Sequence, residues 1–108
     1  MASQEALFIR IRLSDDDLGS ARDDERVYAL EKAIEIALTD KHAGHFDGHE
    51  FGGGWATVFC YGESATQLFE AAVSTLLQAA LRGGSCAVKR YGGPGSREEV
   101  VDLSGGAA

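Results

Sequence analysis

Alternating apolar and polar positions predict two of the strands. Apolar residues at positions 7, 9, 11 and 13 alternate with Phe8, Arg10 and Arg12, which is the period of two of a strand with one buried face. A similar alternation runs over residues 86–91, before the glycine-rich segment 92–96 breaks the chain. Residues 98–103 are a candidate for a further strand at the edge of the sheet.

Helical spacing predicts two helices. Apolar positions recur three and four residues apart over 27–38 and again over 68–80, so each segment presents one apolar stripe. Residues 20–23 and 64–67 carry Ser-x-x-Asp and Ser-x-x-Gln, patterns typical of a helix start. We expect the first helix to end near Thr39 and the second before Gly83.

The glycines at 52–54 predict a hairpin between the two helices. They separate segments 44–51 and 55–61, and glycine tolerates the positive φ angles of a tight reversal. If all three form the loop, the numbers of paired residues sum to 106. The pairs on the exposed face are then His45–Tyr61, Asp47–Phe59 and His49–Thr57. A two-residue loop pairs His45 with Cys60 instead, but it pushes polar residues into the core, so the first register is preferred.

The order of these elements predicts a fold of the α+β class. The sequence β-α-β-β-α-β is that of a ferredoxin-like two-layer sandwich, and right-handed crossovers put both helices on one face. The antiparallel sheet then has the order 4-1-3-2, with a fifth edge strand as an option. In this order Cys60 and Cys86 are separated by two strand spacings, about 9.6 Å. This exceeds the reach of a disulfide, so both are predicted to be free thiols.

Length and charge limit the classes of partner. The chain has 108 residues, which suits one domain over 1–108 with a frayed tail at 104–108. Its net charge of −7 disfavours nucleic acid and anionic lipid as partners. No apolar stretch approaches the roughly 20 residues that cross a bilayer, so we expect no membrane partner and a cytoplasmic location. No cofactor is predicted.

Four segments carry a resemblance to known sequences. They are Ile-Arg-Leu-Ser-Asp-Asp at 11–16, Phe-Asp-Gly-His-Glu-Phe-Gly-Gly-Gly at 46–54, Tyr-Gly at 61–62 and Val-Lys-Arg-Tyr-Gly at 88–92. With them the chain resembles a group of small bacterial proteins of uncharacterised function with a predicted ferredoxin-like fold. The resemblance implies that fold and a bacterial source, and it assigns no functional residue.

The uncovered sheet face is the main candidate for binding. Alternation directs aromatic and cationic side chains onto it: Phe8, Arg10, Arg12, Trp55, Phe59, Tyr61, Lys89 and Tyr91. Such a surface is typical of a contact with another chain, either a second copy in a homodimer or a different protein. Phe8 and Phe59 could stack on RNA bases. However, the glycine-aromatic signature of RNA-recognition domains is missing and the net charge opposes phosphate, so nucleic acid is disfavoured.

The histidines near the hairpin are weaker candidates for chemistry. His45, Asp47 and His49 point to one side of a regular strand, and two imidazoles with one carboxylate can form an open iron site. Alternate residues of a strand stand nearly 7 Å apart, so the three converge on one ion only if the strand bends. In the less favoured register, His45 and Cys60 would form a base and a nucleophile. A polar edge strand and a buried thiol are the simpler interpretations, and no metal site is predicted.

These observations favour a binding or regulatory domain without enzymatic activity, acting by protein association through the open sheet face. No convincing catalytic set supports a reaction. One alternative is a small dimeric enzyme resembling ferredoxin-like monooxygenases, with a pocket between helices and sheet lined by His or aromatic groups. Another is a toxin immunity or inhibitor protein, whose acidic loop at 15–17 would mask a basic partner.

Overall fold

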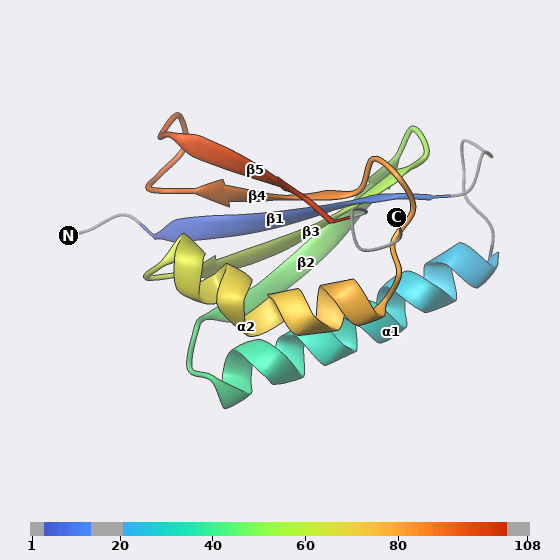
Figure 1. Ribbon diagram of the computed structural model, residues 1–108, viewed down its shortest axis with the longest axis horizontal. Coiled ribbons are helices and arrows are strands. Elements are labelled where there is room, and N and C mark those ends of the chain that lie inside the picture. Colours follow the sequence, from blue (N-terminus) through green and yellow to red (C-terminus); the bar gives the residue numbers. More distant parts are fainter. Residues whose placement is uncertain (1–3, 14–20, 104–108) are drawn as a thin grey trace.

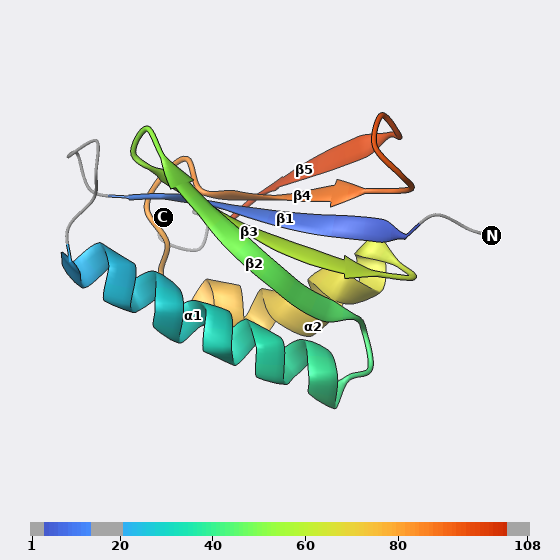
Figure 2. The same ribbon diagram turned by 180° about the vertical axis from the view of Figure 1, so that it is seen from behind.

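Five antiparallel strands form one sheet, and two helices lie side by side against one of its faces (Figures 1 and 2). The computed structural model describes residues 4–13 and 21–103, without the side chains of 21–23. The strands and helices in chain order are β1 (Glu5–Arg12), α1 (Ala21–Asp40), β2 (His45–Gly52), β3 (Trp55–Gly62), α2 (Ala65–Gln78), β4 (Cys86–Arg90) and β5 (Glu98–Asp102).

The predicted ferredoxin-like sandwich, with the sheet order 4-1-3-2 and a fifth edge strand only as an option, is wrong. The chain continues into β5, so the sheet has five strands in the order β2-β3-β1-β4-β5 and the elements run β-α-β-β-α-β-β. β5 pairs with β4 along its whole length, from Cys86–Asp102 to Arg90–Glu98. The physical reason is the turn at 92–96, which returns the chain beside β4 and makes β5 the edge strand. The α+β class itself holds.

The core lies between the sheet and the two helices. β3 alternates strictly between partly and fully buried residues, and on β1 the fully buried Leu7 and Ile9 face the helices. Ile34 and Leu38 of α1 meet them from one helix, and α2 adds a buried stripe of Leu68, Ala72 and Leu76. Ser64 caps α2 by accepting a hydrogen bond from the Gln67 amide at 3.2 Å, as the sequence pattern predicts.

The register of the β2–β3 hairpin is right at one end and wrong at the other. His45 pairs with Tyr61 as predicted, but His49 pairs with Val58 rather than Thr57 because the register shifts between Phe46 and His49. Gly52 pairs with Trp55, which leaves only two glycines in the loop, both with positive φ. The shorter loop moves the pairing near it by one residue relative to the pairing at His45. A bulge in β2 between Phe46 and His49 accommodates this extra residue, and Gly48 within it has a φ of +98°.

The two cysteines are free, as predicted. Cys60 pairs with Leu7 of β1 and is buried on the side of the sheet that the helices cover. Cys86 pairs with Arg10 of β1 and lies on the opposite side of the sheet. No helix in the described part of the chain is long and apolar enough to cross a membrane. The predicted acidic loop at 15–17, the cap pattern at 20–23 and the frayed tail at 104–108 lie outside the residues and side chains that the structure describes.

Candidate interaction surface on the open sheet face

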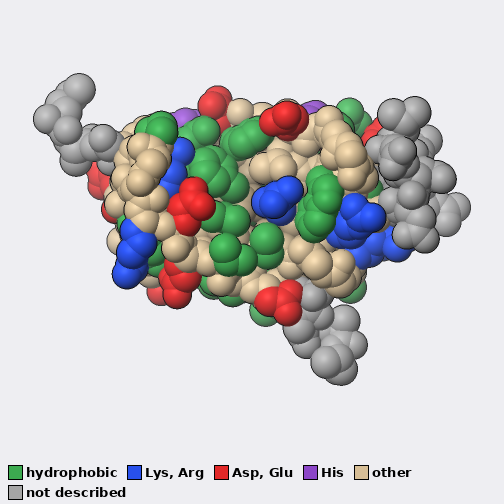
Figure 3. Space-filling view, turned by 90° about the horizontal axis from the view of Figure 1, so that it is seen from above, with side chains coloured by type: hydrophobic (Ala, Val, Ile, Leu, Met, Phe, Trp, Pro, Cys, Tyr) green, Lys and Arg blue, Asp and Glu red, His purple; other side chains and the backbone are tan. Residues whose placement is uncertain are grey.

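An apolar row crosses the sheet face that the helices leave uncovered. We call this surface the open face. Cross-strand pairing aligns Phe59 of β3, Phe8 of β1, Val88 of β4 and Val100 of β5. Val100 is 66% exposed at the edge of the sheet. Figure 3 looks onto this face and shows hydrophobic side chains gathered across its centre, with Lys and Arg side chains among them.

A mixed polar row lies on each side of the apolar row. One contains Glu50, Thr57, Arg10, Cys86 and Asp102, and the other contains His45, Tyr61, Ala6, Arg90 and Glu98. In both rows the arginine stands on an inner strand and the acids stand on the edge strands. The open face therefore carries charges of both signs in a regular arrangement.

Aromatic rings and guanidinium groups hold the centre of this face in place. The Phe8 ring meets Phe59 and Tyr61 edge to face, with centroid distances of 5.7 and 6.2 Å. The Arg90 guanidinium lies 5.2 Å from the Phe8 ring centroid. Trp55 has two cations over its ring, because Arg10 and Arg12 lie 4.8 and 5.3 Å from its centroid. Such contacts hold these side chains in place.

Six of the eight predicted residues lie on the open face, and two do not. Lys89 pairs with the buried Leu7, so its side chain turns to the helix side, where its Nζ lies 4.9 Å from the Phe69 ring centroid. Tyr91 donates a hydrogen bond to Glu99 Oε1 at 2.7 Å, and Lys89 Nζ lies 3.3 Å from the same oxygen. The prediction took the wrong parity for β4 because Ala87 and Val88 are both apolar, and alternation cannot tell which of them is inside.

The positions that the parity error missed are Val88 and Arg90. Val88 belongs to the apolar row and Arg90 to a mixed row, as described above. Their place is fixed by the pairing of Phe8 with Val88, which is a tertiary contact. Phe8 lies on the open face, so its partner Val88 lies there too. Arg90 is two residues further along β4 and therefore points to the same face.

The histidine candidates are separated by the bulge in β2. His45 stays on the open face, where its ring centroid lies 6.1 Å from that of Tyr61. His49 turns to the helix side, where its Nδ1 lies 3.0 Å from Glu31 Oε2 on α1. Asp47 falls within the shifted segment and does not pair with Phe59 as predicted. Within the described residues no group of three or more His, Cys, Asp or Glu side chains is placed to hold a metal ion.

The Glu31–His49 contact is a buried polar pair. The Glu31 side chain is only 8% exposed and that of His49 is 28% exposed. His49 Nδ1 also approaches Glu31 Oε1 to 2.8 Å, but hydrogen-bond geometry is met only at Oε2, which leaves Oε1 without a hydrogen-bond partner.

Burial, together with the nearby Glu31 charge, raises the pKa of the Cys60 thiol to about 12. The thiol therefore stays protonated at neutral pH and is a poor nucleophile.

Comparison with known proteins adds no relative. No family model, no curated protein and no solved structure matches the chain. The geometry of the open face is therefore the basis for a functional proposal.

Proposed function

We propose that this chain is an association domain without enzymatic activity, which forms a homodimer through its open face. The observation that carries the proposal is the apolar row, which runs over four strands and ends at the exposed Val100. An apolar centre with a charged and aromatic surround is the usual anatomy of a protein interface. Burial of this row against a second copy would remove its apolar surface from water.

The charge pattern favours a second copy over other partners. A face that binds itself must supply both halves of every ion pair, because the same patch appears on both sides of a two-fold axis. The open face meets this condition, since Arg10 and Arg90 stand on inner strands and Glu50 and Glu98 stand on edge strands. A second copy laid across the face can bring edge acids over inner arginines. The net charge of −7 does not favour a nucleic acid.

The solution mass tests the proposal directly. Sedimentation or light scattering should give twice the chain mass of 11.4 kDa for the wild type. Phe59→Glu and Val100→Glu place a charge in the apolar row and should give folded monomers, because an unpaired charge in a desolvated contact is costly. Val100→Glu is the safer variant, since that side chain is already 66% exposed.

The matched control is Leu77→Glu. Leu77 is 53% exposed on α2, which lies against the opposite face of the sheet, so this variant should remain dimeric. A wild type that sediments at the mass of one chain would refute the homodimer. A dimer that persists in both open-face variants would place the contact elsewhere on the molecule.

A further inference from the structure

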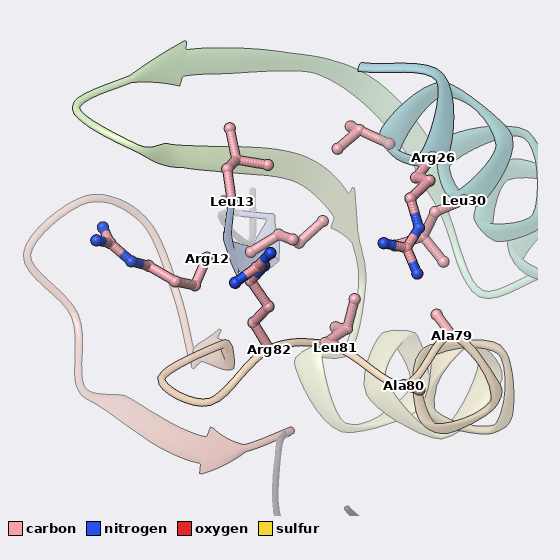
Figure 4. A pocket seen from close by; sticks show the side chains of 10 residues that line it. Arg12, Leu13, Arg26, Leu30, Ala79, Ala80, Leu81 and Arg82 are labelled. Carbon is pink, nitrogen blue, oxygen red and sulfur yellow. The ribbon is translucent and has the colours of Figure 1, made fainter. Parts of the chain in front are cut away.

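A small pocket opens where the end of β1 meets α1 and the segment that follows α2 (Figure 4). Its volume is about 70 Å³. Its apolar lining comes from all three of these segments: Ile11, Leu13, Val27, Leu30, Ala79, Ala80 and Leu81. No histidine or aromatic side chain lines it among the residues that the structure describes. It therefore differs from the pocket expected of a monooxygenase-like enzyme.

The wall formed by residues 79–81 depends on an unusual backbone turn. α2 ends at Gln78, and Ala80 then adopts a positive φ of 51°. This position after a helix is commonly a glycine, because a side chain raises the energy of the left-handed region. The turn brings Leu81 back against the core. Ala80 thus takes the left-handed conformation that commonly ends a helix, as His42 does after α1, and this turn shapes the edge of the pocket.

The charged residues among those described at the pocket are three arginines, Arg12, Arg26 and Arg82. Figure 4 shows that Arg26 of α1 and Arg82 after α2 direct their guanidinium groups toward the pocket, while Arg12 extends away from it. Arg12 instead lies over the Trp55 ring, as Arg10 does. The structure records no ion pair for Arg26 or Arg82 within the described ranges.

We infer that this pocket binds a small carboxylate with a short branched hydrocarbon tail. Guanidinium groups pair with carboxylates through two parallel hydrogen bonds, and the apolar lining would take the hydrocarbon. A cavity of roughly 150 Å³ can hold the six carbons of benzene, so about 70 Å³ admits roughly three non-hydrogen atoms. The branched end of a short tail, an isopropyl group, fits that space. The site lies away from the open face and does not depend on the proposed homodimer.

A titration followed by amide NMR tests the inference, with 3-methylbutanoate as the probe. We expect saturable shifts at the amides of Leu13, Val27 and Leu81, which line the pocket. The uncharged 3-methylbutanamide should bind about tenfold more weakly, since it loses the charge-assisted hydrogen bonds. Acetate should also bind about tenfold more weakly, since it lacks the tail. Added salt should weaken the binding of 3-methylbutanoate, because both arginines are solvent-exposed and salt screens their charges.

Variants assign the effect to the two arginines. Arg26→Gln and Arg82→Gln should each lower the affinity for 3-methylbutanoate about tenfold. The control Arg97→Gln should not, because Arg97 lies over the Tyr91 ring and is no part of the pocket. Val100→Glu should bind the probe like the wild type, whether or not it is a dimer.

Three results would overturn the inference. One is the absence of saturable shifts at about 20 mM probe, where a ligand of this size should be detectable. Another is equal binding of acetate or inorganic phosphate, which would indicate an anion site that makes no use of the apolar lining. The last is unchanged affinity in both arginine variants.

Discussion

Replacement of His49 by phenylalanine should destabilise the fold by leaving a buried carboxylate unpaired. Glu31 has an 8% exposed side chain, and its only hydrogen bond in the described structure comes from His49 Nδ1 to Oε2 at 3.0 Å. The His49 ring also packs against Phe51 and Tyr28, with centroid distances of 4.8 and 5.5 Å. His49→Phe keeps an aromatic ring in that position and removes only the donor.

The expected cost follows from this geometry. A buried acceptor that loses its partner costs about 1 to 3 kcal/mol, so we expect the free energy of unfolding to fall by about 2 kcal/mol. For a domain whose total stability is about 5 to 15 kcal/mol this is a large fraction. Glu31→Leu should be neutral or stabilising, since it removes the desolvated carboxylate altogether.

Urea denaturation followed by circular dichroism measures both effects. In the Glu31→Leu background His49→Phe should cost close to nothing, because no carboxylate remains to be satisfied, and the difference between backgrounds is the coupling energy of the pair. His45→Phe on the open face is the control and should change stability by less than about 0.5 kcal/mol. Equal losses from His49→Phe in both backgrounds would refute the reasoning.

Three further changes test other parts of the structure. His42 has a φ of +53° in a Schellman turn, where the Ala43 amide donates to the Leu38 carbonyl at 3.0 Å; His42→Gly should raise the urea midpoint, with a gain of about 0.5 to 1 kcal/mol after glycine's entropy cost. In thiol labelling of the native protein only Cys86 should react, because burial raises the pKa of Cys60 to about 12, and Cys60 labelling without denaturant would contradict this. The hydrogen bond from Tyr91, followed by the contact with Lys89, lowers the pKa of Glu99, so Tyr91→Phe should raise that pKa in a carboxyl NMR titration. Because the folded-state pKa is lowered, the stabilisation by ionised Glu99 is present above its unfolded pKa and is lost as pH falls through the folded value.

Local patterns predicted most of the individual elements. The alternation at 7–13 and the helical stripes at 27–38 and 68–80 arise from the periods of strand and helix, which a single segment displays without its neighbours. The capping pattern at Ser64 likewise depends on two residues three apart. The open face was predicted on β1 and β3 because apolar and polar positions alternate there.

The errors fall where two elements must agree. Residues 86–91 contain adjacent apolar residues, so only pairing with β1 decides that Ala87 faces the helices and Val88 the open face. The β2 register depends on a bulge that accommodates a two-residue loop, and this bulge turns His49 from the open face to Glu31. The fifth edge strand, which the sequence left as an option, is decided by the return of the chain beside β4.

The sequence by itself determined the α+β class, the stretches that became helices and strands, and an aromatic and cationic face on β1 and β3. The tertiary structure decided the membership of that face on β2 and β4, the separation of the histidines, and the grouping of Arg26 and Arg82 around one pocket. The physical reason is that periodicity fixes which residues of one segment share a side. Which side faces the core, and which distant residues meet, depends on the pairing and packing of segments far apart in the chain.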